Sequence, residues 1–367
     1  FQKRMENEYN VLLISIDTLR PDHLGCYGYE KDISPHIDQL ADEGAVFQNA
    51  FSQAPWTLPS HLSMLTSIYP SVFKDGEKRK EYFLSNPSLS IASILQKNGY
   101  ITGGITGGGN VDPDFGYSQG FNSGYTTTSA KDESQIHESY VIFKEWIKRH
   151  KEDRFFLFFH TFEVHDYITA KEKHILKNID PNNIRLQMLE LYDNKIAHMD
   201  NYIGLITNDL KKLGIYDKTL IIITSDHGEE FFEHGNLGHQ TSLYNELLKV
   251  PLIFRLPGKI PSKIKIKNNV RVVDIKTTIL SILGIEDENP QEGKSLLSFL
   301  DNTEDENRTI FAEETGSVIG EALDIKSIQN DQYKFILSPV ATTPPGFNYD
   351  IKNFGELYDL NKDLAEK

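Results

Sequence analysis

Short apolar segments without alternation of polar residues recur along the chain. They cover residues 11–16, 155–159, 220–223 and 250–254. Segments of this length and pattern are typical of strands buried on both faces of a sheet. Between them, apolar residues recur at spacings of three and four over 88–95, 186–210 and 275–283, which predicts helices. Strands that alternate with helices predict an α/β fold with a mostly parallel sheet, covered on both faces.

The pattern changes after about residue 300, where the segments become shorter. Residues 333–337 and 356–360 are predicted as short strands among turns. We therefore expect a large domain over residues 1–300 and a smaller C-terminal α+β subdomain over 301–367, packed on the first.

Composition and charge narrow the range of partners. The 367 residues include 38 Lys and Arg against 53 Asp and Glu, a formal net charge of -15. This field repels polyanions, so we expect no nucleic acid or anionic membrane surface as a partner, and an anionic ligand must be attracted locally. No apolar run approaches the roughly 20 residues of a transmembrane helix. The oligomeric state is left open.

Two features bear on the cellular compartment. The single cysteine, Cys26, excludes an internal disulfide framework and is compatible with several compartments. The first residue is Phe1 rather than methionine, which suggests that a leader or anchor has been removed. An extracytoplasmic or periplasmic location is therefore favoured over a cytoplasmic one.

Polar side chains follow three of the predicted strands directly. Asp17 and Thr18 come after the first, a stretch from His160 to His165 after the second, and Asp226 and His227 after the third. The carboxyl ends of parallel strands meet at one edge of a sheet, where ligands bind. Because buried carboxylates without partners are costly, a shared cation is the economical arrangement.

A fourth segment, around Thr57, reads as the start of a helix. Thr57 is a good N-cap residue, and Pro59 falls within the first turn. Exposed amide hydrogens and the positive end of the helix dipole favour an anionic oxygen beside the Thr57 hydroxyl. Taken alone, a threonine here is more often only a cap.

Together these segments resemble the sulfatase family of the alkaline phosphatase superfamily. The similar segments lie in the same order over nearly the whole chain, at residues 10–28, 34–41, 44–51, 57–70, 160–165, 193–204, 224–230, 233–235, 238–239, 250–253, 273–275, 293–296 and 356–360. The resemblance implies a three-layer α/β/α sandwich with a smaller C-terminal subdomain. It also implies an enzyme, a hydrolase of phosphoric or sulfuric ester bonds, whose catalytic domain is the part over residues 1–300.

The nucleophile motif departs from the family pattern. In the family it reads Cys or Ser, any residue, Pro, Ser, Arg, and the first residue is oxidised to formylglycine. Here Thr57 is first and His61 is last. Threonine cannot yield the aldehyde, because its carbinol carbon carries a methyl group. Threonine nucleophiles occur elsewhere in the superfamily, among phosphodiesterases and head-group transferases, so the departure favours phosphorus esters.

The resemblance also implies a metal site. By position Asp17, Asp226 and His227 are similar to the family's metal ligands, and the Thr57 oxygen completes the set. Thr18 stands where the family has a second aspartate, and we include it as a candidate ligand. Two carboxylates and one imidazole suit one divalent ion, Mn, Zn, Mg or Ca.

Further candidates surround this set. His165 resembles a histidine that binds the transferred group, and His239 stands where many relatives have a lysine; either could protonate the leaving oxygen. Asn110, His61 and Arg20 are candidate substrate contacts, with a structural ion pair as the alternative for Arg20 and helix packing as that for His61. The glycine run over residues 103–109 lacks the lysine of a phosphate-binding loop.

We therefore predict a metal-dependent hydrolase that uses Thr57 to cleave phosphodiester, phosphonate, phosphomonoester or sulfate esters. Its substrate is expected to be a small-molecule or a glycan- or lipid-linked anionic ester. Three alternatives stay open: a transferase that moves a phosphoryl-linked head group to a lipid or glycan, a sulfate-ester hydrolase that works without formylglycine, and a non-catalytic binding module. Loops at residues 72–85, 126–140 and 166–185 are expected to set substrate choice.

Overall fold

The computed structural model describes residues 9–73, 84–128, 135–168, 181–240, 242–301, 307–315, 324–338 and 355–367. Within these ranges a nine-stranded sheet has the order β11-β2-β10-β6-β1-β5-β3-β4, with β9 paired to β2. Its strands are β1 (Asn10–Ile16), β2 (Ala45–Phe51), β3 (Ile101–Thr106), β4 (Tyr125–Thr127), β5 (Phe155–Thr161), β6 (Thr219–Thr224), β9 (Lys249–Val250), β10 (Leu252–Arg255) and β11 (Ile264–Arg271).

The centre of this sheet is parallel, as predicted. β1 runs parallel to both β5 and β6, and β5 is also parallel to β3. β10 runs antiparallel to its two neighbours, β6 and β2. The predicted single strand over 250–254 is instead divided between β9 and β10 at Pro251, because proline has no backbone N–H to donate to a neighbouring strand.

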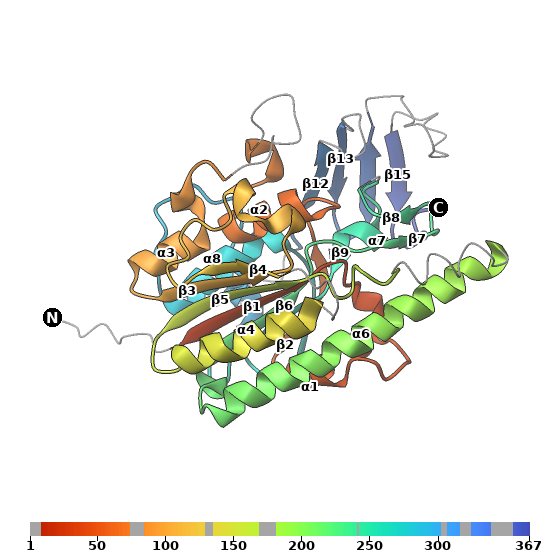
Figure 1. Ribbon diagram of the computed structural model, residues 1–367. Coiled ribbons are helices and arrows are strands. Elements are labelled where there is room, and N and C mark those ends of the chain that lie inside the picture. Colours follow the sequence, from red (N-terminus) through yellow and green to blue (C-terminus); the bar gives the residue numbers. More distant parts are fainter. Residues whose placement is uncertain are drawn as a thin grey trace.

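Helices cover both faces of the sheet (Figure 1). They are α1 (Pro35–Asp42), α2 (Thr57–Thr66), α3 (Ile91–Lys97), α4 (Gln135–Arg149), α6 (Pro181–Lys212), α7 (Asn245–Leu248), α8 (Ile275–Leu283) and α9 (Leu297–Leu300). Alternate side chains of β1 point to opposite faces: Val11 and Leu13 join one buried core with α2, α3 and α8, whereas Leu12 and Ile14 join the other with α1, α4 and α6. The predicted three-layer α/β/α arrangement is therefore confirmed. Among the described helices, none is both long and apolar enough to cross a membrane.

A second sheet follows at the C-terminal end of the chain. Within the described residues its order is β12-β13-β14-β15, and all neighbours are antiparallel. The strands are β12 (Ile310–Thr315), β13 (Asp324–Gln329), β14 (Tyr333–Leu337) and β15 (Gly355–Asp359). This sheet confirms the smaller C-terminal subdomain and its two predicted strands, while the exact boundary near residue 300 stays a prediction. Ile310 and Ile336 of this sheet share an apolar cluster with Phe51, Leu243 and Leu248 of the larger part.

Candidate active site

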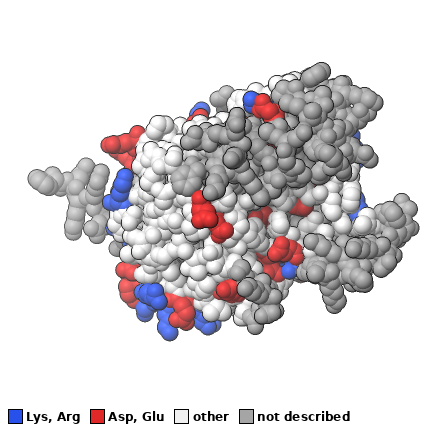
Figure 2. All heavy atoms as spheres, turned by 45° about the horizontal axis from the view of Figure 1, so that its top comes forward, with Lys and Arg blue, Asp and Glu red and all other residues white. Residues whose placement is uncertain are grey.

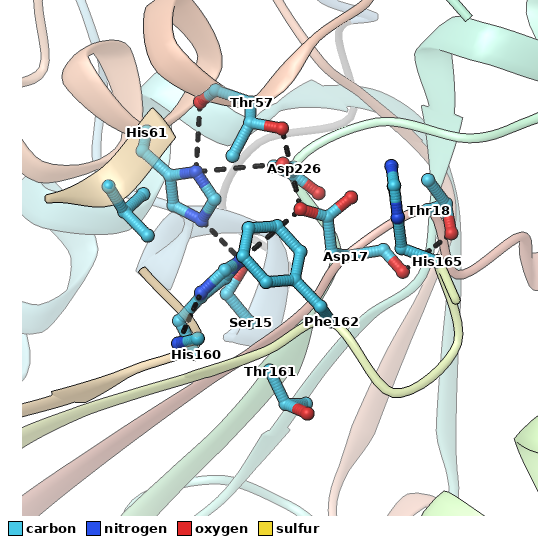
Figure 3. Close-up of polar contacts among 12 residues, drawn as sticks. Ser15, Asp17, Thr18, Thr57, His61, His160, Thr161, Phe162, His165 and Asp226 are labelled. Carbon is cyan, nitrogen blue, oxygen red and sulfur yellow. Dashed lines mark hydrogen bonds and ion pairs between the residues drawn. The ribbon is translucent and has the colours of Figure 1, made fainter. Parts of the chain in front are cut away.

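Four predicted site residues from separate parts of the chain meet at the carboxyl edge of the large sheet. The Thr57 hydroxyl lies 3.3 Å from Oδ2 of Asp17 and 3.4 Å from Nε2 of His227. The same His227 nitrogen lies 3.4 Å from Oδ2 of Asp226 and 3.6 Å from Oδ1 of Asp17. In Figure 3 the side chains of Thr57, Asp17 and Asp226 point toward one another. The convergence of these groups is therefore a feature of the fold.

The turn after β1 holds Asp17 in place. Its backbone N–H donates to the Thr161 carbonyl at the end of β5, 3.0 Å away. Thr18 follows with a φ of 62°, which is a strained conformation for a β-branched residue and is typically found at functional sites. Leu19 N then donates to Oγ of Ser225, in the loop that carries Asp226. Hydrogen bonds between these loops therefore fix where Asp17 points.

Thr57 is the first residue of α2, and the N-cap position is occupied by Trp56. The prediction that Thr57 caps this helix was therefore wrong by one residue. This difference matters chemically, because a hydroxyl that does not bond to the helix amides is available to the neighbouring carboxylate. The helix is buried over its whole length, and Ser60 one turn later donates to the Asp226 carbonyl, 2.6 Å away. This bond joins the helix to the loop after β6.

The donor atoms fit a divalent cation. His227 donates from Nδ1 to the Gly228 carbonyl, 2.8 Å away, so its Nε2 presents a lone pair toward Asp17, Asp226 and Thr57. Burial lowers the pKa of His227, which keeps the ring neutral. Oδ1 of Asp17 and Oδ2 of Asp226 are buried, and neither has a hydrogen-bond partner among the described residues. Burial and the charge of Asp226 raise the pKa of Asp17, as expected where two carboxylates face each other without a cation.

Thr18 does not join this set of donor atoms. Its hydroxyl donates to the Asp17 backbone carbonyl, 2.7 Å away, so it is engaged with its own turn rather than with the carboxylates. Its assignment as a metal ligand stays a prediction, and the geometry lends it no support.

Two buried histidines, His160 and His61, form hydrogen bonds with residues of the site. Nδ1 of His160 accepts from the Gly107 N–H, so Nε2 carries the hydrogen that is donated to Oδ2 of Asp17, 3.3 Å away. His61 donates from Nδ1 to the Thr57 carbonyl and accepts from the Ser15 hydroxyl, both at 2.9 Å. Because His61 is fully buried and both its nitrogens are used, the structure favours its helix-packing alternative over a substrate contact.

Arg20 is likewise occupied by protein groups. Its guanidinium forms a two-bond ion pair with Asp22, at 2.7 and 3.0 Å. It also donates to a carboxylate oxygen of Glu233 and to the Glu229 carbonyl. This geometry favours the structural ion pair that the sequence left open as the alternative to substrate binding.

His165 and His239 lie next to each other beside the candidate metal ligands. Their ring centroids are 5.3 Å apart, and the His239 ring lies 4.4 Å from that of His227. Burial lowers the pKa of His165, but its hydrogen bond to Asp166 and the charges of Asp17 and Glu229 outweigh burial and raise that pKa to about 9. This shift favours the protonated form of the His165 ring, which can attract an anionic group.

Sequence reasoning missed two residues that hold His239. The buried carboxylate of Glu229 lies 2.9 Å from Nδ1 of His239 and accepts a hydrogen bond from the Tyr167 hydroxyl, 3.2 Å away. Burial raises the pKa of Glu229, but His239 and the other nearby histidines outweigh burial and lower that pKa. The position of Glu229 two residues after His227 was the only sequence feature that could have indicated its role. Tyr167 offered none.

Asn110 lies in a 3-10 turn, Gly109–Val111. The glycines before it allow close packing: a Cβ at Gly107 would come 2.4 Å from the Phe162 ring. Phe162 in turn contacts the rings of His160 and His165. The glycine run therefore brings this turn close to the site, and the role of Asn110 in substrate binding stays a prediction. Of the predicted substrate loops, residues 74–83, 129–134 and 169–180 lie outside the described residues.

Charge on the visible surface is scattered rather than concentrated. On the described part of the face in Figure 2, acidic and basic side chains are interspersed with large uncharged areas, and no continuous basic patch is seen. This distribution agrees with the expectation that an anionic ligand is attracted by local groups rather than by the whole molecule.

Comparison with known proteins identifies relatives over most of the chain. Residues 9–285 match the sulfatase family model, and residues 233–367 match the model of the N-sulphoglucosamine sulphohydrolase C-terminal region. An N-acetylgalactosamine-6-O-sulfatase from Bacteroides thetaiotaomicron is 23% identical over 98% of this chain and 88% of its own length. An ulvan-active sulfatase from Formosa agariphila is 23% identical over 84% of this chain, which spans only 57% of that protein.

Among solved structures, the phosphonate monoester hydrolase of Agrobacterium radiobacter has a TM-score of 0.74. It is 20% identical, and the match covers 98% of this chain and 90% of that protein. At this level of identity the likeness establishes the fold alone.

Proposed function

Since the chain belongs to the sulfatase family of the alkaline phosphatase superfamily, we propose that it hydrolyses anionic esters with Thr57 as the nucleophile and one divalent metal ion as cofactor. Membership of the sulfatase family supports a hydrolase of the sulfuric-ester class. The observation that carries the proposal is the contact of the Thr57 hydroxyl with Asp17 and His227. Beside it lie two buried carboxylate oxygens that have no hydrogen-bond partner among the described residues.

Asp17, Asp226 and His227 would hold the metal ion, and their donor atoms lie within 4.8 Å of one another. When bound, a divalent cation lowers the pKa of a coordinated hydroxyl and offsets charge on the transferred group. Assays with Mn, Zn, Mg and Ca will identify the ion that the site binds.

The protein side chains divide the remaining work. The Thr57 hydroxyl releases its proton to solvent, its oxygen attacks sulfur or phosphorus, and the bond to the leaving oxygen breaks in line with it. His165, whose pKa is raised by its acidic neighbours, binds the oxygens of the group being transferred. His239, oriented by Glu229, donates a proton to the leaving oxygen. Water then gives a proton to the neutral His239 ring and attacks sulfur or phosphorus, which releases sulfate or phosphate. The Thr57 oxygen regains its proton from solvent.

Two ester classes are candidates, and different observations favour them. Sulfate esters of saccharides are favoured by the relatives of this chain, which include an N-acetylgalactosamine-6-O-sulfatase. Phosphorus esters are favoured by Thr57 itself, since this chain cannot form the aldehyde nucleophile with which the sulfatase motif acts, and by Thr18. With Thr18 in place of a second aspartate, the site carries one negative charge fewer and repels a phosphate dianion less.

The test is a panel of nitrophenyl sulfate, phosphate monoester, phosphate diester and phosphonate monoester, each assayed with Mn, Zn, Mg and Ca. Thr57→Ala is expected to reduce kcat/KM on the preferred substrate by roughly three orders of magnitude or more, as when a covalent nucleophile is removed. Thr57→Ser keeps the hydroxyl and should retain much more activity than Thr57→Ala. Equal rates for the wild type and Thr57→Ala on every substrate would reject the assignment.

Product analysis with an added alcohol separates hydrolysis from transfer. A hydrolase releases one free sulfate or phosphate for each leaving group that it releases. A head-group transferase instead passes the sulfate or phosphate group to the alcohol. We expect most of the sulfate or phosphate to be transferred to water.

A further inference from the structure

A second group of metal-ligand side chains lies apart from the proposed active site. Glu230, His234 and Glu246 each place a carboxylate oxygen or ring nitrogen within 4.8 Å of the others. Glu230 lies in β7 (Glu230–Phe231), which pairs with β8 (Leu237–Gly238), and His234 lies in the turn between these strands. Glu246 comes from α7. Two separate elements of the fold are thus needed to build the group.

The ring of His234 is held in one orientation. Its Nε2 lies 2.8 Å from the Glu366 carbonyl, which can only accept, so this nitrogen carries a hydrogen. The ring stacks on Tyr244 with centroids 3.6 Å apart. Nδ1 consequently faces the carboxylate of Glu246, with which it is in contact. In His234, Nε2 donates to a carbonyl while Nδ1 faces carboxylates. This arrangement is typical of metal-binding imidazoles.

Glu230 provides an independent sign that a ligand is involved. Its side chain is fully buried, and Oε1 accepts hydrogen bonds from the backbone of His234 and Asn236, at 3.0 and 2.8 Å. Oε2 is also buried and has no hydrogen-bond partner among the described residues. A buried carboxylate oxygen without a partner is costly, and a cation would satisfy it without disturbing the bonds to Oε1.

The charges around the group leave room for a cation. Lys334 is the nearby buried amine, and it is paired with Glu366 at 2.9 Å and donates to Asn245 at 3.0 Å. His234 is therefore the imidazole nearest to both carboxylates, and its Nδ1 forms an ion pair with Glu246. Lys334 also acts on Glu246 electrostatically, but its direct partners are Glu366 and Asn245. A proton on that imidazole offsets one negative charge, whereas a divalent ion offsets both.

We propose that Glu230, His234 and Glu246 form a second divalent-cation site with a structural role. One imidazole and two carboxylates suit a borderline ion such as Zn²⁺ or Mn²⁺. Because His234 also binds the Glu366 carbonyl, an ion here would fasten the β7–β8 hairpin and α7 to the last residues of the chain. The site is independent of the proposed chemistry at Thr57.

Zinc counting on four proteins tests the proposal. Wild type, Asp226→Asn, Glu230→Gln and the double variant are stripped with a chelator, reloaded with Zn²⁺, desalted and analysed by mass spectrometry of the metal. We expect about two zinc equivalents per chain in the wild type, about one in each single variant and none in the double variant. Glu190→Gln, which removes an exposed carboxylate from α6, is the matched control and should bind as the wild type does.

The outcomes separate this site from the active site. Asp226→Asn without any zinc would overturn the second site, as would a double variant that binds as much zinc as Asp226→Asn. A different result is expected if the second site exists but the active site binds no metal. Asp226→Asn would then bind as much zinc as the wild type, and Glu230→Gln would bind none. Circular dichroism checks that each variant is folded. If Glu230→Gln does not fold, His234→Gln takes its place. If neither variant folds, the number of zinc ions bound to Asp226→Asn decides the question.

Discussion

Glu229 and His239 are joined by a hydrogen bond of 2.9 Å between Oε2 and Nδ1. Glu229 is buried, and the His239 ring reaches the ring of His227. A buried carboxylate that binds one imidazole nitrogen fixes the orientation of the ring and directs the other nitrogen toward the reaction. Glu229 is therefore a positioning residue in the proposed mechanism, and this role can be tested by leaving-group dependence.

Glu229→Gln should lower kcat by roughly 10- to 100-fold, the usual cost of removing a carboxylate that orients a functional histidine. The loss should be larger for esters with poorly acidic leaving groups than for nitrophenyl esters, because only the former need a proton on the departing oxygen. Rates are measured over a series of substituted phenyl esters. Tyr167→Phe, which removes only the hydroxyl bound to Glu229, is the control and should lose less. An equal loss for every leaving group would contradict the role.

Divalent metal ions should stabilise the wild type against unfolding. An ion at 100 times its Kd contributes about 2.7 kcal/mol to the free energy of unfolding, because ligands such as Asp17 and Asp226 come together only in the folded chain. Melting temperatures are measured with and without Mn, Zn, Mg and Ca in Glu230→Gln, so that only the active site responds. Asp226→Asn in the same background should respond much less. An identical response of both proteins would argue against this metal site.

Stability should depend on Asp193 in a narrow acidic range. Burial raises the pKa of Asp193, but hydrogen bonds from His23, Lys31 and Tyr29 outweigh burial and lower that pKa below its usual 3.8. A depressed carboxyl pKa contributes stability above the unfolded value, and this contribution is lost as pH falls through the folded value. Urea unfolding should therefore show a larger stability difference between the wild type and Asp193→Asn at about pH 5 than at lower pH. The difference should shrink below about pH 4, and one that grows on acidification would contradict the assignment.

The buried ion pair of Lys276 and Asp287 should show strong coupling. Their charged atoms are 2.7 Å apart, and both side chains are almost fully buried. Asp287→Asn leaves the ammonium of Lys276 uncompensated and should lower the free energy of unfolding by about 3–5 kcal/mol. The same change in a Lys276→Met background should cost much less. Denaturant titrations of the four proteins give the coupling energy, and additive effects would show that the pair is not coupled.

Much of the fold was predictable because its strands are buried on both faces. Residues 11–16, 155–159 and 220–223 lie in β1, β5 and β6, the three adjacent central strands. A strand covered by helices on both sides needs apolar side chains at every position, and this produces an unbroken apolar run in the sequence. The run over 250–254 was less well predicted, since Pro251 interrupts the pairing.

The convergence at the site was predictable for the same reason. Asp17, Asp226 and His227 follow parallel strands, and parallel strands deliver the residues after them to one edge of the sheet. The partners of long side chains were not predictable in this way. Arg20 binds Asp22 and Glu233, and no spacing rule distinguishes these carboxylates from the many others in the chain.

The layered α/β architecture, the family and the set of acidic, imidazole and hydroxyl groups that reach one edge could be predicted from the amino-acid order, because periodicity and chain order are local properties. Only the tertiary structure decided that Thr57 lies inside the helix rather than at its cap, that His61 and Arg20 are occupied by protein partners, and that Glu229 holds His239. These outcomes depend on contacts between distant segments, such as the bond from Ser60 to the Asp226 carbonyl across 166 residues. Such contacts arise from packing geometry, which leaves no periodic trace in the chain.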